Sequence, residues 1–171
     1  DYTTEERILL DVEVIKEDGS KHYLAVNDAV VARGQLSKTI DLHLTLDGDE
    51  ISKYRADGLL FSTPTGSTAY SLSAGGPILA PKMECILMTP VCPHSLFSRS
   101  VLFSGESELS VHVKIPEECC CVLTIDGEKN VPVLATDRVV IRESDLKLKL
   151  ALLHNRNFYK LLNEKLKEWD F

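Results

Sequence analysis

The sequence predicts a mainly β protein of the α+β class, an antiparallel β-sandwich of many short strands with two helices. Three observations support this prediction. Apolar and polar residues alternate over short segments, Asp-Gly pairs separate several of these segments, and the segments recur at intervals of about ten residues. One helix is expected after a Thr-Pro-Thr-Gly-Ser-Thr-Ala-Tyr turn, and a second, amphipathic one near the C-terminus.

The first half of the chain contains the clearest strand patterns. Segment 7–15 alternates, with its apolar residues on one face, and Asp18-Gly19 after it is typical of a hairpin turn. Segment 21–33 is a long β-prone run, and 41–46 alternates again before a second hairpin signal at Asp47-Gly48. Further strands are expected at 51–54, 59–61, 85–88, 101–103, 109–113, 122–125 and 138–141.

Two segments have helical rather than strand patterns. The first helix is expected to begin at Ser67 or Thr68 and to end at Gly75-Gly76-Pro77, because glycine followed by proline is a strong stop signal. Segment 157–169 has apolar residues at helical spacing, typical of a docking face. No linker divides the chain, so we expect a β-rich domain over 1–154 and a helical appendage over 155–171.

Composition excludes several classes of function. The net charge is −7 without a basic patch, which argues against nucleic-acid binding. No apolar run is long enough for a membrane helix and the N-terminus is no signal peptide, so we expect a cytoplasmic protein with no membrane contact. The odd number of cysteines, three of them consecutive at 119–121, predicts reduced apolar fillers rather than disulfides or a metal site.

The most informative segment runs from Asp57 to Pro77, and seven of its residues are Ser or Thr. Pro64 fixes one backbone angle, and Gly66 permits either a close backbone approach or a positive φ. Backbone amides at the start of the following helix would point at a ligand above the turn. The hydroxyls of Thr65, Thr68 and Ser73 could bind ribose or phosphate, and Tyr70 adds a stacking face. On composition alone, a loop that caps its own helix is equally plausible.

Two other polar segments have two readings each. Asn27-Asp28 interrupts an apolar run, where polar groups are costly unless hydrogen-bonded, and is either a ligand contact or an Asx turn. Asp126-Gly127 is either a nucleotide-contacting turn or a plain hairpin. His94, in the Pro-His-Ser-Leu segment at 93–96, is expected to be structural. Asp47-Gly-Asp-Glu lacks the spacing of a calcium loop.

Taken in order, the Asn27 segment, the Asp57–Pro77 block, the Pro-His-Ser-Leu segment and the Asp126-Gly127 turn resemble the C-terminal domain of NAD kinases. These enzymes phosphorylate the 2′-hydroxyl of the adenosine ribose of NAD. The resemblance implies a β-rich NAD-binding domain, although Asp28 stands where the family usually has Glu. Arg55 is either a phosphate contact or an ordinary exposed arginine. The implied ligand contacts are Asn27, Asp28, Arg55, Asp57, Thr65, Thr68, Ala69, Tyr70, Ser71, Leu72, Ser73 and Asp126.

The resemblance also implies what the rest of the enzyme supplies. The phosphoryl donor is ATP or polyphosphate, a divalent metal such as Mg²⁺ takes part, and a Gly-Gly-Asp-Gly aspartate in an N-terminal domain acts as the base. No Gly-Gly-Asp-Gly occurs here. Because phosphoryl transfer depends on positioning and charge stabilisation, the chain alone is expected to be inactive, with no catalytic residue of its own and no metal site. We expect segment 155–171 to pack on that domain or on a neighbour, and the chain to form a homodimer or homotetramer.

Two other functions fit parts of the pattern. A non-catalytic nucleotide-sensing or oligomerisation module would keep the β-rich core and the site but never join a kinase half. An upstream Gly-Gly-Asp-Gly in the same reading frame would distinguish the kinase from that module. A lipid kinase of similar two-domain plan would need an apolar cleft, and the long hydroxyl block argues against one.

Overall fold

The computed structural model describes residues 2–34, 39–95, 98–115, 121–153 and 157–168, and strands dominate these ranges. The strands are β1 (Thr3–Lys16), β2 (Gly19–Ala25), β3 (Asp28–Arg33), β4 (Ile40–Leu46), β5 (Asp49–Ala56), β6 (Gly58–Ser62), β7 (Cys85–Val91), β8 (Val101–Ser104), β9 (Leu109–Lys114), β10 (Cys121–Ile125), β11 (Lys129–Val133) and β12 (Arg138–Leu152). The helical segments are the 3₁₀ turn η1 (Gly66–Thr68), α1 (Tyr70–Ser73) and α2 (Phe158–Glu168).

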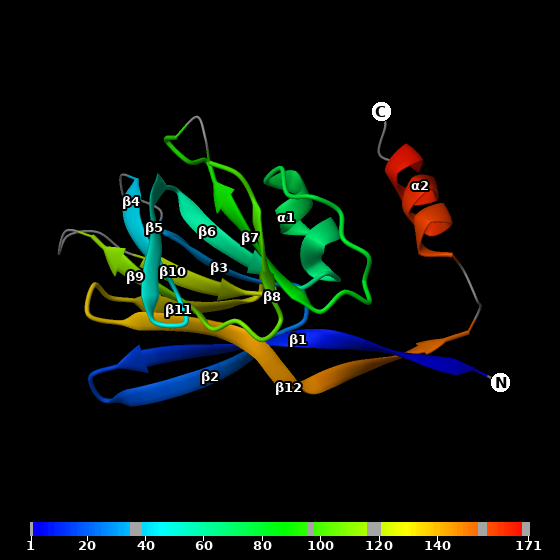
Figure 1. Cartoon of the computed structure of the whole chain (residues 1–171), viewed down its shortest axis with the longest axis horizontal. Helices are drawn as coiled ribbons and strands as arrows, with labels where there is room; N and C mark the ends of the chain where they lie inside the picture. Colours follow the sequence, from blue (N-terminus) through cyan, green and yellow to red (C-terminus); the bar gives the residue numbers. More distant parts are fainter. Residues whose placement is uncertain (1, 35–38, 96–97, 116–120, 154–156, 169–171) are drawn as a thin grey trace.

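The strands form two six-stranded sheets packed face to face (Figure 1). One sheet has the order β2-β1-β12-β9-β4-β5, and the other has the order β11-β10-β3-β6-β7-β8. The paired strands within both sheets are antiparallel. The predicted fold class, a mainly antiparallel β-sandwich with few helices, is therefore confirmed.

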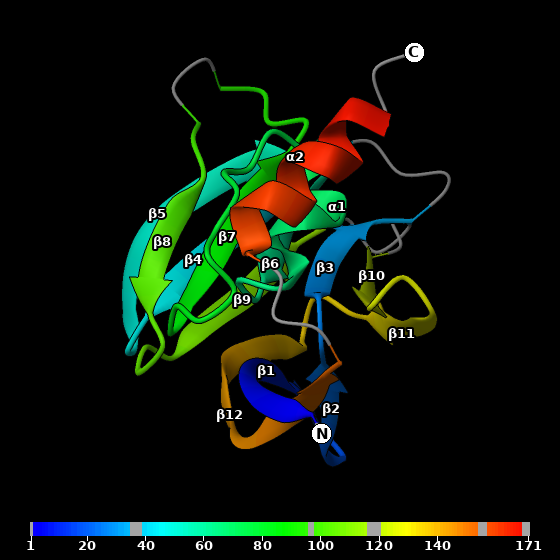
Figure 2. The same ribbon diagram turned by 90° about the vertical axis from the view of Figure 1, so that its right-hand side faces the viewer.

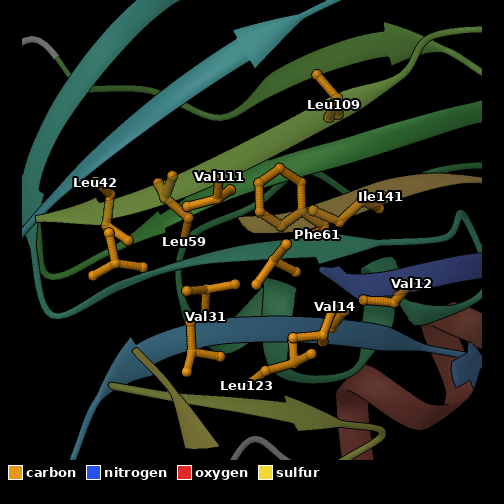
Figure 3. Packing of buried hydrophobic residues seen from close by; sticks show 14 of the residues in the cluster. Val12, Val14, Val31, Leu42, Leu59, Phe61, Leu109, Val111, Leu123 and Ile141 are labelled. Carbon is orange, nitrogen blue, oxygen red and sulfur yellow. The ribbon is translucent and has the colours of Figure 1, made fainter. Parts of the chain in front are cut away.

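The core lies between the inner faces of the two sheets. Leu10, Val12 and Val14 of β1 are fully buried on one face, as the alternation predicted. Figure 3 shows Phe61 of the second sheet among side chains from both layers, including Val111 and Ile141 of the first. Burial of this continuous apolar layer is the main stabilising term of the fold.

The observed strands differ from the predicted ones where contacts between distant segments determine the strand bounds. The run 21–33 is split at Val26-Asn27, and its two parts enter different sheets as β2 and β3. Strands β1 and β12 are longer than predicted, because they pair with each other beyond the sandwich as a ribbon from Ile8 and Lys147 outward. The edge strand β11 was not predicted; its Pro132 and charged Lys129 obscure the pattern.

The helix after the hydroxyl block is shorter than predicted and is interrupted at Ala69. The Ser67 hydroxyl donates to the Pro64 carbonyl (2.7 Å) and accepts from the Leu79 amide (3.0 Å), so it serves the turn and not a long helix. The predicted stop is confirmed: Gly75 has φ +86°, and its amide donates to the Leu72 carbonyl (3.0 Å).

The C-terminal helix α2 lies at the same end of the sandwich as α1 (Figure 2). Phe158, Leu162 and Leu166 of α2 line an apolar groove together with Thr68 and Leu72. Leu161 and Leu166 remain 37% and 38% exposed, so the apolar stripe of α2 is only partly covered.

The cysteine prediction holds for some positions only. Cys85 and Cys121 are free and buried, whereas Cys92 is exposed and has φ +46°. The remaining cysteines at 119 and 120, together with Leu96 and Trp169, lie outside the described residues. None of the helices in the described ranges is both long and apolar enough to span a bilayer.

Candidate functional site

Two predicted site segments meet at one end of the second sheet. Strand β3 begins at Asp28 and strand β6 ends at Ser62, and these two residues are direct cross-strand partners. The Val26-Asn27 turn before β3 therefore lies beside the turn that follows β6. Backbone contacts join the two turns, since the Thr63 amide donates to the Asn27 carbonyl (2.9 Å).

The carboxylate of Asp126 binds three consecutive backbone amides of the Val26–Asp28 segment. Oδ2 accepts from the Val26 amide (2.8 Å), and Oδ1 accepts from the amides of Asn27 (2.7 Å) and Asp28 (3.0 Å). In return, the Asp126 amide donates to the Asp28 carbonyl (2.9 Å). Asp126 has φ +49° and Gly127 has φ +71°, a type I′-like hairpin conformation that Asp-Gly favours. Asp126-Gly127 therefore forms a hairpin turn, and the Asp126 carboxylate also accepts hydrogen bonds from the Val26–Asp28 backbone.

The same segment is held from its other side by Thr63, which is fully buried. The Thr63 hydroxyl donates to the Val26 carbonyl (2.7 Å) and accepts from the Gly66 amide (3.0 Å). A Cβ on Gly66 would lie 2.0 Å from the Asn27 carbonyl oxygen. Of the two roles predicted for Gly66, the close backbone approach is the one observed.

The hydroxyls of the block divide into an inner and an outer set. Ser67 and Ser71 are fully buried, and the Ser71 hydroxyl lies 3.0 Å from that of Thr89, which lies 3.1 Å from that of Ser100. The inner set therefore builds the turn. The outer set consists of the partly or fully exposed hydroxyls of Thr65, Thr68, Tyr70 and Ser73, and the predicted site residues Ala69 and Leu72 are also partly or fully exposed. Tyr70 is 47% exposed, which leaves its ring available for stacking.

Among the described acids at this end of the molecule, Asp28 has the most strongly shifted pKa. Its side chain is 5% exposed, and no described side chain donates a hydrogen bond to its carboxylate. Burial, and secondarily the Asp126 carboxylate, raise the pKa of Asp28 from 3.8 to about 6. The facing Ser62 hydroxyl is also buried and has no partner among the described groups. Strongly perturbed pKa values of this kind cluster at functional sites.

Asp57 and Arg55 lie at the opposite end of β6. The five residues of β6 lie between Asp57 and Thr63, so these two positions are six steps apart, about 20 Å at 3.3 Å per residue. Asp57 pairs with Arg33 (2.8 Å), and the Arg55 guanidinium binds Asp41 (2.8 Å) and lowers the pKa of that exposed carboxyl. The predicted site residues therefore form two groups, and the structure does not bring them together within one copy.

Sequence reasoning missed two residues that build this end of the sheet. Thr63 lies within the hydroxyl block, but nothing in the sequence distinguishes it from its exposed neighbours. Thr89 is hidden in the apolar strand β7.

His94 is exposed, and its amide donates to the Arg55 carbonyl (2.8 Å) in a turn. Within the described ranges, no group of three or more His, Cys, Asp or Glu residues could hold a metal ion.

Comparison with known proteins identifies one family throughout. A family model described as the ATP-NAD kinase C-terminal domain matches residues 26–153. The NAD kinase of Natranaerobius thermophilus is 39% identical over 166 residues, which cover 96% of this chain and 58% of that protein. The NAD kinase of Lachnoclostridium phytofermentans is 38% identical over 170 residues, covering 96% and 60%. The chain thus spans less than two thirds of these curated relatives.

Two solved structures share the fold. Yeast NADH kinase complexed with NADH has a TM-score of 0.86 and 28% identity, with 96% of this chain and 50% of that chain covered. An NAD kinase from Archaeoglobus fulgidus in complex with ATP has a TM-score of 0.78 and 26% identity, covering 96% and 60%.

Proposed function

The chain belongs to the family of ATP-NAD kinase C-terminal domains, and we propose that it is the dinucleotide-binding half of an NAD kinase. The proposed reaction transfers a phosphoryl group from ATP, or from polyphosphate, to the 2′-hydroxyl of NAD and yields NADP. The observation that carries this proposal is the end of the second sheet, where Asn27-Asp28 and the exposed part of the hydroxyl block lie side by side.

In this proposal the chain binds and orients the acceptor. Tyr70 stacks on a ring of the dinucleotide, and Thr65, Thr68 and Ser73 bind ribose or phosphate oxygens. Asn27 and Asp28 bind the adenine and ribose end, and the backbone of Ala69 and Leu72 lines the same surface. The Ser71 hydroxyl points inward, so its part is to hold α1 in place.

The chemical step is proposed to need a second domain. The family's catalytic aspartate belongs to a Gly-Gly-Asp-Gly segment, which this sequence does not contain. The Mg²⁺ that the family implies has no ligand set within the described residues, and no residue of this chain is proposed to hold it. The proposed partners are thus NAD or NADP and an N-terminal kinase domain, on which segment 155–171 is proposed to pack.

Self-association as a homodimer or homotetramer is part of the same proposal. Within one copy, Asp57 and the Thr63 turn lie at opposite ends of β6, about 20 Å apart for six steps of 3.3 Å. A second copy offers another source of Asp57 and Arg55. Sedimentation of the purified chain, with and without NAD, gives the copy number.

The test is a calorimetric titration of NAD into the purified chain, with NADP and ATP as comparisons. We expect saturable binding of NAD or NADP, weakened on the order of tenfold or more in Tyr70→Ala because base–aromatic stacking is lost. Tyr2→Ala is the matched control, since Tyr2 is also an exposed tyrosine but is not one of the predicted site residues. A folded chain that binds no dinucleotide contradicts the proposal.

The same samples test the need for a second domain. We expect the chain with ATP and Mg²⁺ to form no NADP above the level of the Tyr70→Ala and Asp57→Ala variants. Formation of NADP above these controls would show that the chain carries its own catalytic residue. Binding without activity in the longest form of the protein would instead favour a nucleotide-sensing module.

A further inference from the structure

The backbone of Val26–Asp28 needs hydrogen-bond partners that its own sheets do not supply. At Val26-Asn27 the chain leaves the first sheet and enters the second, so the ladder of either sheet is interrupted here. Buried backbone amides without partners are costly, and this segment is part-buried. The conformation that presents Asn27 and Asp28 therefore depends on acceptors from elsewhere in the chain.

Asp126 supplies those acceptors from about 100 residues away in the sequence. Its two carboxylate oxygens accept all three amides at 2.7–3.0 Å, as in an anion-binding nest closed by a side chain instead of a ligand. A carboxylate has about four lone-pair sites, and three are used by these bonds. Charge-assisted bonds to backbone amides are among the strongest hydrogen bonds in proteins.

We propose that Asp126 is a positioning residue: it fixes the Asn27-Asp28 turn for the dinucleotide, and it does not bind the ligand itself. This inference rests on the proposed function. Fully buried Thr63 holds the carbonyl side of the same turn, so the segment is clamped through its amides by Asp126 and through its carbonyls by Thr63. Asp126 differs in this respect from the exposed hydroxyls and from Tyr70, which face outward.

A second hairpin in the chain provides a matched comparison. Asp47 has φ +50° and is followed by Gly48 at φ +93°, the same conformation as Asp126-Gly127. Its carboxylate accepts one backbone amide, that of Glu108 (2.9 Å), and its amide donates to the Glu108 carbonyl (2.9 Å). Asp47 therefore performs the same kind of bracing at a turn that contains no predicted site residue.

The experiment combines amide hydrogen exchange with NAD titration for the wild type, Asp126→Asn and Asp47→Asn. Asparagine keeps the shape but loses the charge and one acceptor oxygen. We expect Asp126→Asn to lower the exchange protection of the Val26, Asn27 and Asp28 amides at least about tenfold. NAD affinity should fall about 10- to 100-fold in the same variant. Asp47→Asn should change neither quantity.

If Asp126→Asn does not fold, a second pair of variants tests whether the fixed turn is needed for binding. Thr63→Val removes the buried hydroxyl at nearly constant volume, and Thr63→Ser retains it. Because Thr63 is 0% exposed, it cannot contact a ligand. We expect Thr63→Val to lower both the exchange protection of the turn and the NAD affinity, and Thr63→Ser to keep both near the wild-type values.

Three outcomes would overturn the inference. If Asp126→Asn loses affinity while the three amides stay protected, Asp126 contacts the ligand directly. If protection falls but affinity is unchanged, the turn is not part of the binding site. If neither changes, the carboxylate is dispensable. A folded wild-type chain without dinucleotide affinity would count against the proposed function, whereas the exchange data would still decide whether Asp126 holds the turn.

Discussion

At the scale of single residues, the buried carboxylate of Asp28 lowers the stability of the folded state. A carboxylate that is buried beside a second carboxylate, without a donor of its own, loses hydration and gains repulsion. A chain selected for stability alone would have an apolar residue or an amide at this position. The cost makes sense if a bound ligand supplies the missing hydrogen-bond donors, which is the role proposed for Asp28.

The raised pKa of Asp28 predicts how stability depends on pH. The folded state holds the proton up to about pH 6, whereas the unfolded state releases it near 3.8. The contribution of Asp28 to the free energy of unfolding therefore falls as pH rises from about 4 to about 6. At the standard conversion this penalty reaches about 3 kcal/mol at neutral pH.

Asp28→Asn should remove that penalty and stabilise the chain at pH 7 by about 1–3 kcal/mol. Urea unfolding at pH 4, 5, 6 and 7 gives the measurement, and the difference between variant and wild type should grow over this range. Ser62→Ala is the control, because it removes the facing hydroxyl and no charge. A variant curve parallel to that of the wild type would show that Asp28 ionises normally in the fold.

The residue types of the site could be predicted from the sequence, but their roles could not. The hydroxyl block identified the segment that turns at the end of β6. Which hydroxyls face inward depends on a Thr in β7, an apolar strand that offers no signal of its own. Asp126 was recognised as a candidate, yet its carboxylate serves a turn about 100 residues earlier, and no local pattern reports such a contact.

At the scale of elements, the two turns at the end of the second sheet behave as one unit. Gly66 packs against the backbone of Asn27 so closely that a side chain has no space, and its φ is not in the left-handed region. The requirement for glycine here is therefore steric and arises from the neighbouring turn. The two segments that carry most of the predicted site are thus coupled through contact of their backbones.

Gly66→Ala should separate these turns, because its Cβ would lie 2.0 Å from the Asn27 carbonyl oxygen. We expect a loss of about 3 kcal/mol or more in the free energy of unfolding, together with loss of NAD affinity. Gly19→Ala is a useful comparison. Its hairpin has a positive φ and open space around it, so stability falls while affinity stays. Retained affinity in folded Gly66→Ala would argue that the turns act independently.

Strands could be predicted from the sequence where two alternating segments are neighbours in the chain and a hairpin turn joins them. Both β4–β5 and β1–β2 follow from an Asp-Gly pair between alternating segments. The division of 21–33 was not predictable, because the residues that contact the Val26-Asn27 turn, Asp126 and Thr63, come from distant parts of the sequence. The opposite placement of Asp57 and Tyr70 follows from the length of β6 and depends only on recognising Gly58–Ser62 as one strand.

At the scale of the whole molecule, the sandwich is the stable body and α2 is an addition to it. The fully buried residues come from both sheets, with Phe61 among them, whereas the apolar stripe of α2 is only partly covered. This distribution agrees with the proposed division into a β-rich domain over 1–154 and a helix over 155–171 that packs on another domain or a neighbour.

Two changes measured by urea unfolding test that division. Phe61→Ala should lower the free energy of unfolding by about 3–5 kcal/mol, because it leaves a cavity between the sheets. Removal of residues 154–171 should lower it by less than about 1 kcal/mol, since the exposed residues of α2 contribute little buried apolar area. The slope of the transition should stay similar in both variants, as expected when one cooperative body unfolds. A truncation as costly as Phe61→Ala would mean that α2 belongs to the sandwich, and the proposed docking of this helix on a second domain would then lose its basis.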